Sequence, residues 1–498
     1  MKIAELLKAD EGKTLEFKQD LSSPRSLLKA LVAFANTAGG RIIIGVKDKT
    51  RESVGFNNPL DEEERLCNLI ADSISPRLVP NIELTTVGGK TLLLVEVFLS
   101  NSRPHYLRSE GPETGVYVRL GSTNRQADRE LIAELRRSVE GISFDELPMP
   151  QLTMEDLAID AIKRAFEGIR EIDEQALLTL RLLIKEQGRL VPTKGGILLF
   201  GRDRIAHFSD CWVQCGRFIG TDKARIFDHI ELEEPLPALV DSIMLFLKKH
   251  AMRGADFSEV RRKDVWSIPL EPLREAVVNA LVHADWSQRG GPVRVAFFDD
   301  RIEIENPGIL PPGMTVEDMR QGVSKIRNPV IARVFRELKL IEQWGSGVPR
   351  IFRETAAAGF PEPYLVELGL RVRFIFPLAE LIKTAEVPHR ESGAQVTAQV
   401  GPESRPESRP ESRLETRLGS QLAVKLVLWL AQRAAGKAEL AQHIGHKTVS
   451  GELKKQIRRL LDLGWIEMTI PDKPNSRLQK YRLTEKGKKA LEDGVEAS

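Results

Sequence analysis

The chain has 498 residues, which is too long for one hydrophobic core, so three or four domains are expected. Its hydrophobic content of 42% and charged content of 29% are ordinary for a globular protein, and no apolar run could span a bilayer. Only three cysteines are present, none in a CxxC pair, which favours a reducing cytoplasm over a disulfide framework or a structural zinc site. A formal net charge of +2 does not by itself argue for nucleic-acid binding, so any such argument depends on how the charge is distributed.

Residues 1–135 predict a mixed α/β domain. Strand-like alternation or buried apolar runs occur at residues 14–18, 41–46, 91–98 and 115–120, and helical spacing occurs at residues 26–36. Gly39 and Gly40 separate the helix from the next strand. Glycine tolerates a positive φ there, so a sharp turn is expected.

Residues 140–265 read as a mixed α/β spacer, with residues 195–201 (GGILLFG) as a central strand. We assign it no chemistry. Residues 266–380 form the next domain, in which apolar segments 293–298 and 301–305 flank Asp299-Asp300. Two strands around a short polar turn predict a β-hairpin.

The most informative segment is 273–283 (LREAVVNALVH), which places Glu275 and Asn279 four residues apart. Residues at i and i+4 share one helix face. A carboxylate can activate water and an amide oxygen can bind Mg²⁺. Two glycine-bearing turns follow, at residues 305–308 (ENPG) and 344–347 (WGSG). Together these features predict a nucleotide site.

The C-terminal part differs in composition. Pro402-Glu-Ser-Arg405 recurs within residues 386–419, and this polar, charge-balanced repeat predicts a disordered linker. Residues 420–498 predict a winged helix-turn-helix, with helices at 422–433, 437–444 and 450–463 and wing strands at 464–470 and 479–483. From 421 to 498 there are 15 Lys/Arg against 9 Asp/Glu. A basic helix face formed by Lys454, Lys455, Arg458 and Arg459 is expected to contact DNA, although winged helices also bind proteins.

The helix with Glu275 and Asn279, followed by the two glycine-bearing turns, resembles the order of motifs in the GHKL ATPase superfamily, whose domain is an α/β sandwich. The resemblance implies that Glu275 is the catalytic base and that Asn279 holds Mg²⁺. Asn306 and Gly308 would lie at the adenine, and Gly345 and Gly347 at the phosphates. Lys325 and Arg327, in a lid at 311–328, would reach phosphate oxygens. The family usually has Asp where this chain has Asn306. In the alternative interpretation, Glu275 and Asn279 are solvent-facing and the glycines form ordinary turns; His283 is either packed or part of the site.

The segments 11–18 (EGKTLEFK), 33–40 (AFANTAGG), 44–48 (IGVKD), 103–106 and 117–124 closely resemble the Schlafen/AlbA-type α+β domain. In eukaryotic members this domain cleaves RNA with three carboxylates, and the matching positions are Glu11, Glu16 and Asp48. In bacterial regulators it is read as a nucleic-acid binder. The phosphate contacts would then be Lys18, Arg103, Arg119 and Arg125. In a purely structural interpretation, Glu16 and Lys18 form a solvated ion pair.

The sequence thus predicts a multidomain α/β and α+β protein that binds ATP, Mg²⁺ and DNA, or RNA. We expect a cytoplasmic, homodimeric transcriptional regulator controlled by nucleotide and without membrane contact. The alternative is a metal-dependent nuclease of RNA or DNA gated by ATP, for instance in phage defence. A helicase is not expected, because no G-x-x-x-x-G-K-[ST] loop is present.

Overall fold

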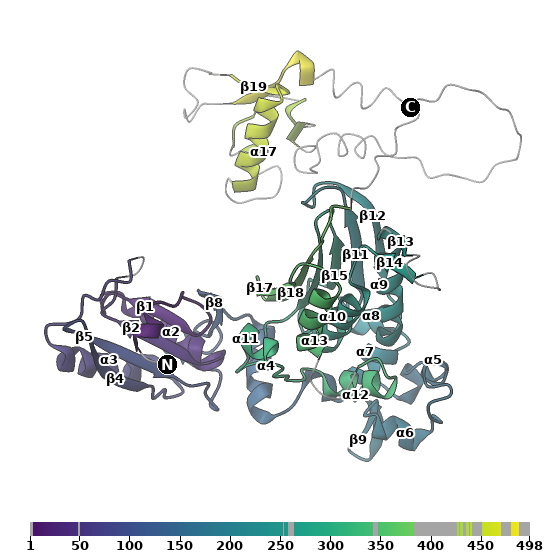
Figure 1. Ribbon diagram of the computed structural model, residues 1–498, viewed down its shortest axis with the longest axis horizontal. Helices are drawn as coiled ribbons and strands as arrows, with labels where there is room; N and C mark the ends of the chain where they lie inside the picture. Colours follow the sequence, from purple (N-terminus) through teal and green to yellow (C-terminus); the bar gives the residue numbers. More distant parts are fainter. Residues whose placement is uncertain are drawn as a thin grey trace, which may run out of the picture. The chain divides into compact units, whose positions relative to one another are not determined.

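The structure, a computed structural model, describes residues 3–47, 50–251, 253–256, 263–341 and 347–382, and short stretches between 426 and 487 (426–427, 429–431, 435–437, 439–440, 451–469, 480–487). At 253–256, 263–265, 451–455 and 462 only the backbone is described. The chain divides into two compact units, Met1–Glu386 and Val387–Ser498, which we describe separately (Figure 1). The linker predicted at 386–419 lies outside the described residues.

The N-terminal domain is built on a four-stranded sheet of order β1-β2-β5-β4, with β1 parallel to β2 and the other pairs antiparallel. Helix α2 packs its apolar side on this sheet, as its helical spacing predicted. The elements are α1 Ile3–Leu6, β1 Leu15–Lys18, α2 Pro24–Asn36, β2 Gly40–Ile44, α3 Pro59–Ser73, β3 Ile74–Ser75, β4 Asn81–Val87, β5 Lys90–Val97, β6 Tyr106–Leu107, β7 Tyr117–Leu120, β8 Thr123–Gln126 and α4 Arg129–Glu140.

The turn between α2 and β2 contains the two glycines that the sequence singled out. Gly39 has a φ of +75° and Gly40 one of +157°. A Cβ on Gly39 would lie 2.8 Å from the carbonyl oxygen of Val97. The predicted sharp turn is therefore confirmed, and close backbone approach adds to the requirement for glycine.

The central region is mostly helical, and here one prediction is wrong. Residues 195–201 are not a strand, because α7 Lys194–Phe200 is a helix. Thr193 caps it, its hydroxyl accepting from the backbone N–H of Gly196 at 2.9 Å. Gly196 serves close packing, since a Cβ there would lie 2.4 Å from the Leu182 carbonyl oxygen. The other elements are 3₁₀ turns Phe144–Glu146 and Met154–Asp156, α5 Ile159–Ala165, α6 Glu174–Thr179, β9 Leu183–Glu186, β10 Arg189–Pro192, α8 Arg204–His207, α9 Leu236–His250, β13 Arg253–Asp256 and β14 Lys263–Trp266.

A six-stranded sheet of order β12-β11-β15-β16-β18-β17 joins this region to the next. Its strands are β11 Val213–Phe218, β12 Ile226–Leu232, β15 Val293–Phe297, β16 Arg301–Pro307, β17 Tyr364–Glu367 and β18 Arg371–Pro377. The predicted hairpin is confirmed, because β15 and β16 pair antiparallel with Phe297 opposite Ile302. Since β11 and β12 precede residue 266, the sheet crosses the boundary expected there.

Helices α9 and α10 Leu270–His283 cover one face of this sheet and share one hydrophobic core with it (Figure 1). Helix α13 Gly347–Ala357 packs against α10, while α11 Val316–Arg320 and α12 Pro329–Glu337 complete the unit. This arrangement brings α10, the end of β16 and the start of α13 together. No helix in the described part of the chain is both long and apolar enough to cross a membrane.

In the second unit, α17 Gly451–Asp462 agrees with the predicted third helix. Strands β19 Ile466–Met468 and β20 Tyr481–Leu483 pair antiparallel within the two predicted wing segments. They share a small apolar core with α17 that includes Leu460 and Trp465. These elements agree with a helix-plus-hairpin unit, and the winged helix itself stays a prediction.

Candidate nucleotide site

A cavity of ≈ 310 Å³ lies between α10, the end of β16, the 309–326 segment, the start of α13 and β18. Its volume is at the lower end of the range for small-molecule sites, and its wall is mainly apolar with a few polar groups, which is typical of such sites. Six of the residues considered from sequence line it: Glu275, Asn279, His283, Asn306, Lys325 and Gly347. The fold therefore gathers residues that are up to 72 positions apart in sequence into one cavity.

Glu275 and Asn279 lie on one face of α10, as their spacing predicted. Nδ2 of Asn279 donates to Oε1 of Glu275 at 3.2 Å, and Glu275 is only 7% exposed. The solvent-facing alternative is thus wrong for Glu275. Within the described residues, Oδ1 of Asn279 has no hydrogen-bond partner and remains available. An amide oxygen is a ligand that Mg²⁺ accepts, so this position fits the metal that the family resemblance implies.

Arg350 is a site residue that sequence reasoning missed. It lies on the first turn of α13 and lines the cavity, and its Nη2 contacts Oε2 of Glu275 at 2.7 Å. The available signal was its position three residues after Gly347, because residues one turn apart share a helix face. The guanidinium neutralises Glu275 in this structure and adds a positive charge to the cavity.

Gly347 allows the start of α13 to approach α10 closely. A Cβ on Gly347 would lie 2.1 Å from Oε1 of Glu275, far inside van der Waals contact. The first N–H groups of a helix attract anions, and Gly347 and Val348 at the start of α13 line the cavity together with Arg350. This end of the cavity can therefore hold phosphate. Gly345, predicted to help close the backbone, lies outside the described residues.

Asn306, at the end of β16, also lines the cavity. Asn306 is 8% exposed and donates through Nδ2 to the carbonyl of Pro307 at 3.1 Å. Gly308 lies behind the wall with a φ of +102°, and a Cβ there would lie 2.8 Å from Cβ of Asp285. Gly308 thus shapes the turn and does not itself line the cavity.

His283 lies on the cavity wall, half-buried, one turn beyond Asn279. Burial and, to a lesser extent, the nearby charge of Arg327 lower the pKa of His283 to about 4. The imidazole is therefore neutral at physiological pH. A neutral ring can donate or accept one hydrogen bond to a ligand but supplies no charge.

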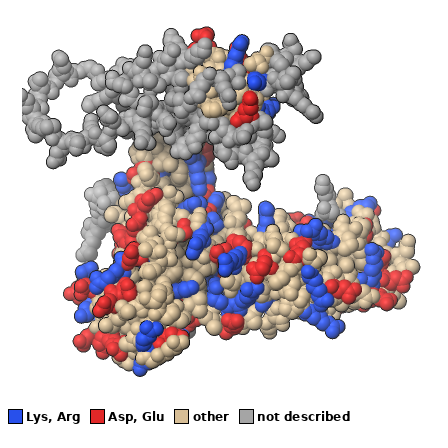
Figure 2. All heavy atoms as spheres, turned by 180° about the vertical axis from the view of Figure 1, so that it is seen from behind, with Lys and Arg blue, Asp and Glu red and all other residues tan. Residues whose placement is uncertain are grey.

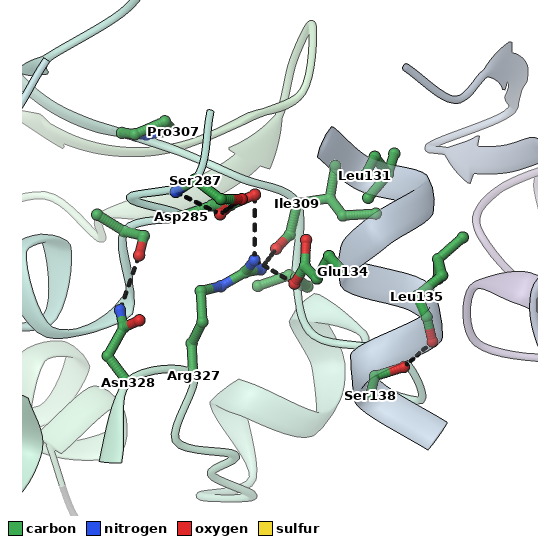
Figure 3. A network of polar contacts seen from close by, with 12 residues as sticks. Leu131, Glu134, Leu135, Ser138, Asp285, Ser287, Pro307, Ile309, Arg327 and Asn328 are labelled. Atoms are coloured by element: carbon green, nitrogen blue, oxygen red, sulfur yellow. Dashed lines mark hydrogen bonds and ion pairs between the residues drawn. The ribbon is translucent and has the colours of Figure 1, made fainter. Parts of the chain in front are cut away.

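The two basic residues expected in the lid have different positions. Lys325 lines the cavity, and its Nζ donates to the Pro312 carbonyl at 2.8 Å. Arg327 is not among the residues that line the cavity, and its side chain points toward Glu134, Asp285 and Ile309 (Figure 3). Its guanidinium contacts the Glu134 carboxylate and the Ile309 carbonyl, and lies 3.7 Å from Oδ2 of Asp285. The predicted phosphate contact of Arg327 is therefore corrected to a contact with helix α4.

Glu134, on α4, and Asp285 both lie beside the Arg327 guanidinium (Figure 3). Burial raises the pKa of Glu134 to about 8, and Arg327 only partly opposes the shift. A protonated Glu134 can share its proton with Asp285, which explains how two carboxylates are held beside one guanidinium.

The cavity wall is tied to the N-terminal domain through Glu367 on β17. Oε1 of Glu367 accepts from the backbone N–H of Leu310, which lines the cavity, at 2.8 Å. Oε2 contacts Nζ of Lys13 at 2.6 Å, and the two side chains are only 9% (Lys13) and 4% (Glu367) exposed. A second link joins Gly313 N–H to the Thr37 carbonyl at 2.6 Å. Movement of the 309–313 segment would therefore disturb its hydrogen bonds and the ion pair that connect it to the N-terminal domain.

Two of the three carboxylates predicted for catalysis, Glu11 and Glu16, already have hydrogen-bond or ion-pair partners. Glu16 is 5% exposed, and its two oxygens contact Lys18 and Arg119, each at 2.5 Å. Oε1 of Glu11 accepts from the backbone N–H of Phe17 at 2.7 Å. Asp48, the third predicted carboxylate, lies outside the described residues. In the described residues no group of three or more His, Cys, Asp or Glu could hold a metal ion.

Arg119 is corrected from a phosphate contact to a structural residue. It is 1% exposed, and its Nε donates to the carbonyl of Gly12 at 3.0 Å in addition to the Glu16 contact. The Glu16–Lys18 pair exists, but it is largely buried and not solvated. Arg125 is exposed, and Arg103 is half-buried with Nη2 donating to Ser138 at 3.1 Å. Both remain predicted nucleic-acid contacts.

On α17, Arg458 and Arg459 are exposed while neighbouring Ile457 and Leu460 are buried. These two arginines therefore lie on the outer face of the helix, where a DNA contact requires them. The side chains of Lys454 and Lys455 lie outside the described residues.

Three regions of the chain match models of known protein families. Residues 11–128 match the family model "Schlafen, AlbA_2", and residues 290–376 match the HATPase_c_4 model, described as "Putative ATP-dependent DNA helicase recG C-terminal". Residues 422–484 match "Filamentation induced by cAMP protein Fic-like, C-terminal domain". The chain thus contains a region similar to the Schlafen/AlbA_2 family and another similar to the RecG C-terminal, HATPase-type family. Helix α10 lies outside the HATPase match.

Among solved structures, a protein from Corynebacterium diphtheriae is similar at 18% identity with a TM-score of 0.42, over 99% of this chain and 98% of that one. The N-terminal domain of a RecG-related protein from Nitrosomonas europaea is 28% identical with a TM-score of 0.21, over 26% of this chain and 94% of that one. No curated protein matches the chain. The two assigned domains indicate a nucleotide-binding protein associated with nucleic acid.

Proposed function

We propose that the protein is an ATP-binding, DNA-binding transcriptional regulator of the cytoplasm whose nucleotide state controls its hold on nucleic acid. The observation that carries this proposal is the cavity on α10, whose wall is bonded to the N-terminal domain through Glu367 and Lys13. A ligand that displaces this wall changes contacts in the Schlafen/AlbA_2 domain. Homodimer formation would pair the nucleic-acid modules of two chains.

Within the cavity, the triphosphate would lie at the start of α13 and the adenine near Asn306. Anionic phosphate would attract Arg350 away from Glu275, because phosphate is the better bidentate partner for a guanidinium at a helix start. Glu275 would then be free to orient water. Mg²⁺, held in part by Asn279, would neutralise phosphate charge.

Titration calorimetry with ATP, with and without Mg²⁺, tests the first half of the proposal. We expect binding by the wild-type chain and a loss of about tenfold or more for Asn279→Ala, as for removal of a polar contact of about 1.4 kcal/mol. The matched control is Asn68→Ala, an exposed position on α3. Absence of heat with every adenine nucleotide would refute nucleotide binding.

Fluorescence anisotropy with labelled duplex DNA tests the second half. We expect the DNA affinity of the wild-type chain to change when ATP and Mg²⁺ are added, and this response to disappear in Glu275→Ala. A DNA affinity that ignores both nucleotide and substitution would refute nucleotide control while leaving DNA binding itself intact.

The nuclease alternative has no specific observation in its favour. Two of its three carboxylates are engaged by cations or backbone within the described residues, and Asp48 lies outside them. Incubation with Mn²⁺ and labelled RNA or DNA is the direct test, with Glu16→Gln as the inactive control.

A further inference from the structure

A second groove, of ≈ 710 Å³, lies outside the nucleotide site, between helix α4 and the central region. Its walls come from α4, Phe144, the start of α7, residues 206–211 and residues 286–289. The central region carried no predicted chemistry. Four basic side chains nonetheless line this groove: Arg129, Arg137, Lys194 and Arg289.

Two of these cations converge on one aromatic ring. Nζ of Lys194 lies 4.1 Å from the centre of the Phe144 ring, and Cζ of Arg137 lies 5.4 Å from the same centre. Both side chains are half-buried. The positive charges of Lys194 and Arg137 repel each other, and salt screens this repulsion only weakly because both side chains are half-buried. Burial lowers the pKa of Lys194, and Arg137 lowers it further.

No carboxylate in the described residues forms an ion pair with any of the four cations. Two acidic residues, Glu130 and Asp210, also line the groove; Oδ2 of Asp210 accepts from Ser209 and from the backbone N–H of Gly290, and two carboxylates offset only part of the charge of four cations. Elsewhere on this unit basic and acidic side chains are interspersed, as Figure 2 shows for one face. The groove thus has a local excess of uncompensated positive charge.

The groove adjoins a neighbouring cavity of ≈ 410 Å³, and Arg137 and Phe144 line both. This second cavity also contains Arg103 and Lys325, and Lys325 lines the nucleotide site as well. Basic side chains therefore line adjoining cavities from the central region past α4 to the lid of the nucleotide site. Together they offer more cationic groups than one phosphate group requires.

We propose that this groove, defined by Arg129, Arg137, Lys194 and Arg289, binds the phosphate backbone of single-stranded nucleic acid. The inference rests on the proposed association with nucleic acid and adds a path through the central region. A flexible single strand can enter the groove to reach half-buried cations, which a rigid duplex cannot do. Since the Phe144 ring is already covered by a cation, recognition is by phosphate and is independent of base sequence.

The test is fluorescence anisotropy of the full-length chain with labelled dT20 and rU20 between 50 and 200 mM salt. Each phosphate contact to a single strand contributes about 0.7 to the slope of log K against log salt. The double variant Arg137→Ala/Lys194→Ala should therefore have a slope shallower by about 1.4, which makes the loss of affinity over this salt range about sevenfold smaller. Affinity at 50 mM salt should fall about tenfold or more.

The matched control is Lys185→Ala/Arg189→Ala, which removes the same charges from exposed positions on the β9–β10 hairpin. It should behave as wild type. The charge-conserving Arg137→Lys/Lys194→Arg should retain the slope, which separates loss of charge from loss of folding. Equal slopes for the alanine variant and its control would overturn the groove proposal.

The outcome also separates this proposal from the proposed function. If the wild-type chain binds no oligonucleotide, association with nucleic acid fails as a whole. If it binds and the groove variant matches the control, only the groove fails. Full displacement of the oligonucleotide by an equal concentration of 5′-AMP would assign the groove to mononucleotides and refute a strand.

Discussion

Replacement of Lys13 by Met tests the link between the N-terminal domain and the nucleotide site. Among the described residues, the substitution leaves the Glu367 carboxylate, 4% exposed, with only the backbone N–H of Leu310 as a partner. Removal of one member of a buried ion pair costs about 3–5 kcal/mol, because the remaining charge stays desolvated. Burial already lowers the pKa of Lys13 despite the attraction of Glu367, so desolvation is large at this position.

Hydrogen exchange measured on the full-length chain gives the local effect. Because about 1.4 kcal/mol is a factor of ten, exchange of the amides of β1 and of β17 should accelerate about a hundredfold or more. Lys8→Met, at an exposed position of the same domain, is the control. Adding Glu367→Gln should recover most of the loss, since a neutral amide still accepts from Leu310. Wild-type exchange in Lys13→Met, or a double variant as unstable as the single one, would refute the argument.

Three further predictions concern single positions. Gly347→Ala should lower ATP affinity in calorimetry and destabilise by about 1–3 kcal/mol, since its Cβ would overlap Glu275; wild-type binding would show that α13 is placed differently. Glu134 has a pKa near 4.5 when unfolded and about 8 when folded, so its contribution to stability is full below pH 4.5 and is lost as pH rises to 8. Glu134→Gln should flatten the unfolding free energy over this window in urea titrations; an unchanged slope would contradict the assignment. Arg119→Met should destabilise by about 1.5–3 kcal/mol, because Glu16 loses its contact with Arg119 and keeps only Lys18 as a cationic partner among the described residues, whereas a pure phosphate contact would lower nucleic-acid affinity at unchanged stability.

Local patterns predicted several elements of the fold. The i, i+4 spacing of Glu275 and Asn279 needed only helix geometry, and both residues lie on one face of α10. The β15–β16 hairpin followed from two apolar runs around Asp299-Asp300. These features depend on contacts within a few residues, which periodicity reports directly.

The error at residues 195–201 has a local cause. A short apolar run between glycines is compatible with a buried strand or a buried helix, and periodicity does not separate them. Thr193 was the available signal, because its hydroxyl caps α7. The two glycines after Lys194, at the start of the predicted strand, permit close packing of the helix.

The errors at Arg327 and Arg119 arise from long-range partners. Arg327 contacts Glu134, 193 residues earlier in the chain, and Arg119 contacts Glu16, 103 residues earlier. A sequence shows that an arginine is present but not whether a distant carboxylate neutralises it. Arg350 was missed for the same reason, since its role depends on the packing of α13 against α10.

Glu367 has one oxygen on the wall of the nucleotide cavity and the other on the N-terminal domain, and this geometry has a thermodynamic consequence. If ATP must shift that wall to enter a cavity of ≈ 310 Å³, breaking the contact between Glu367 and Lys13 lowers the observed affinity for ATP below its intrinsic value. A nucleic acid that weakens the same contact should then strengthen ATP binding. By reciprocity, ATP must strengthen the binding of that nucleic acid by the same factor. Each ligand then reports the presence of the other, and the direction of the response reveals which conformation the oligonucleotide prefers.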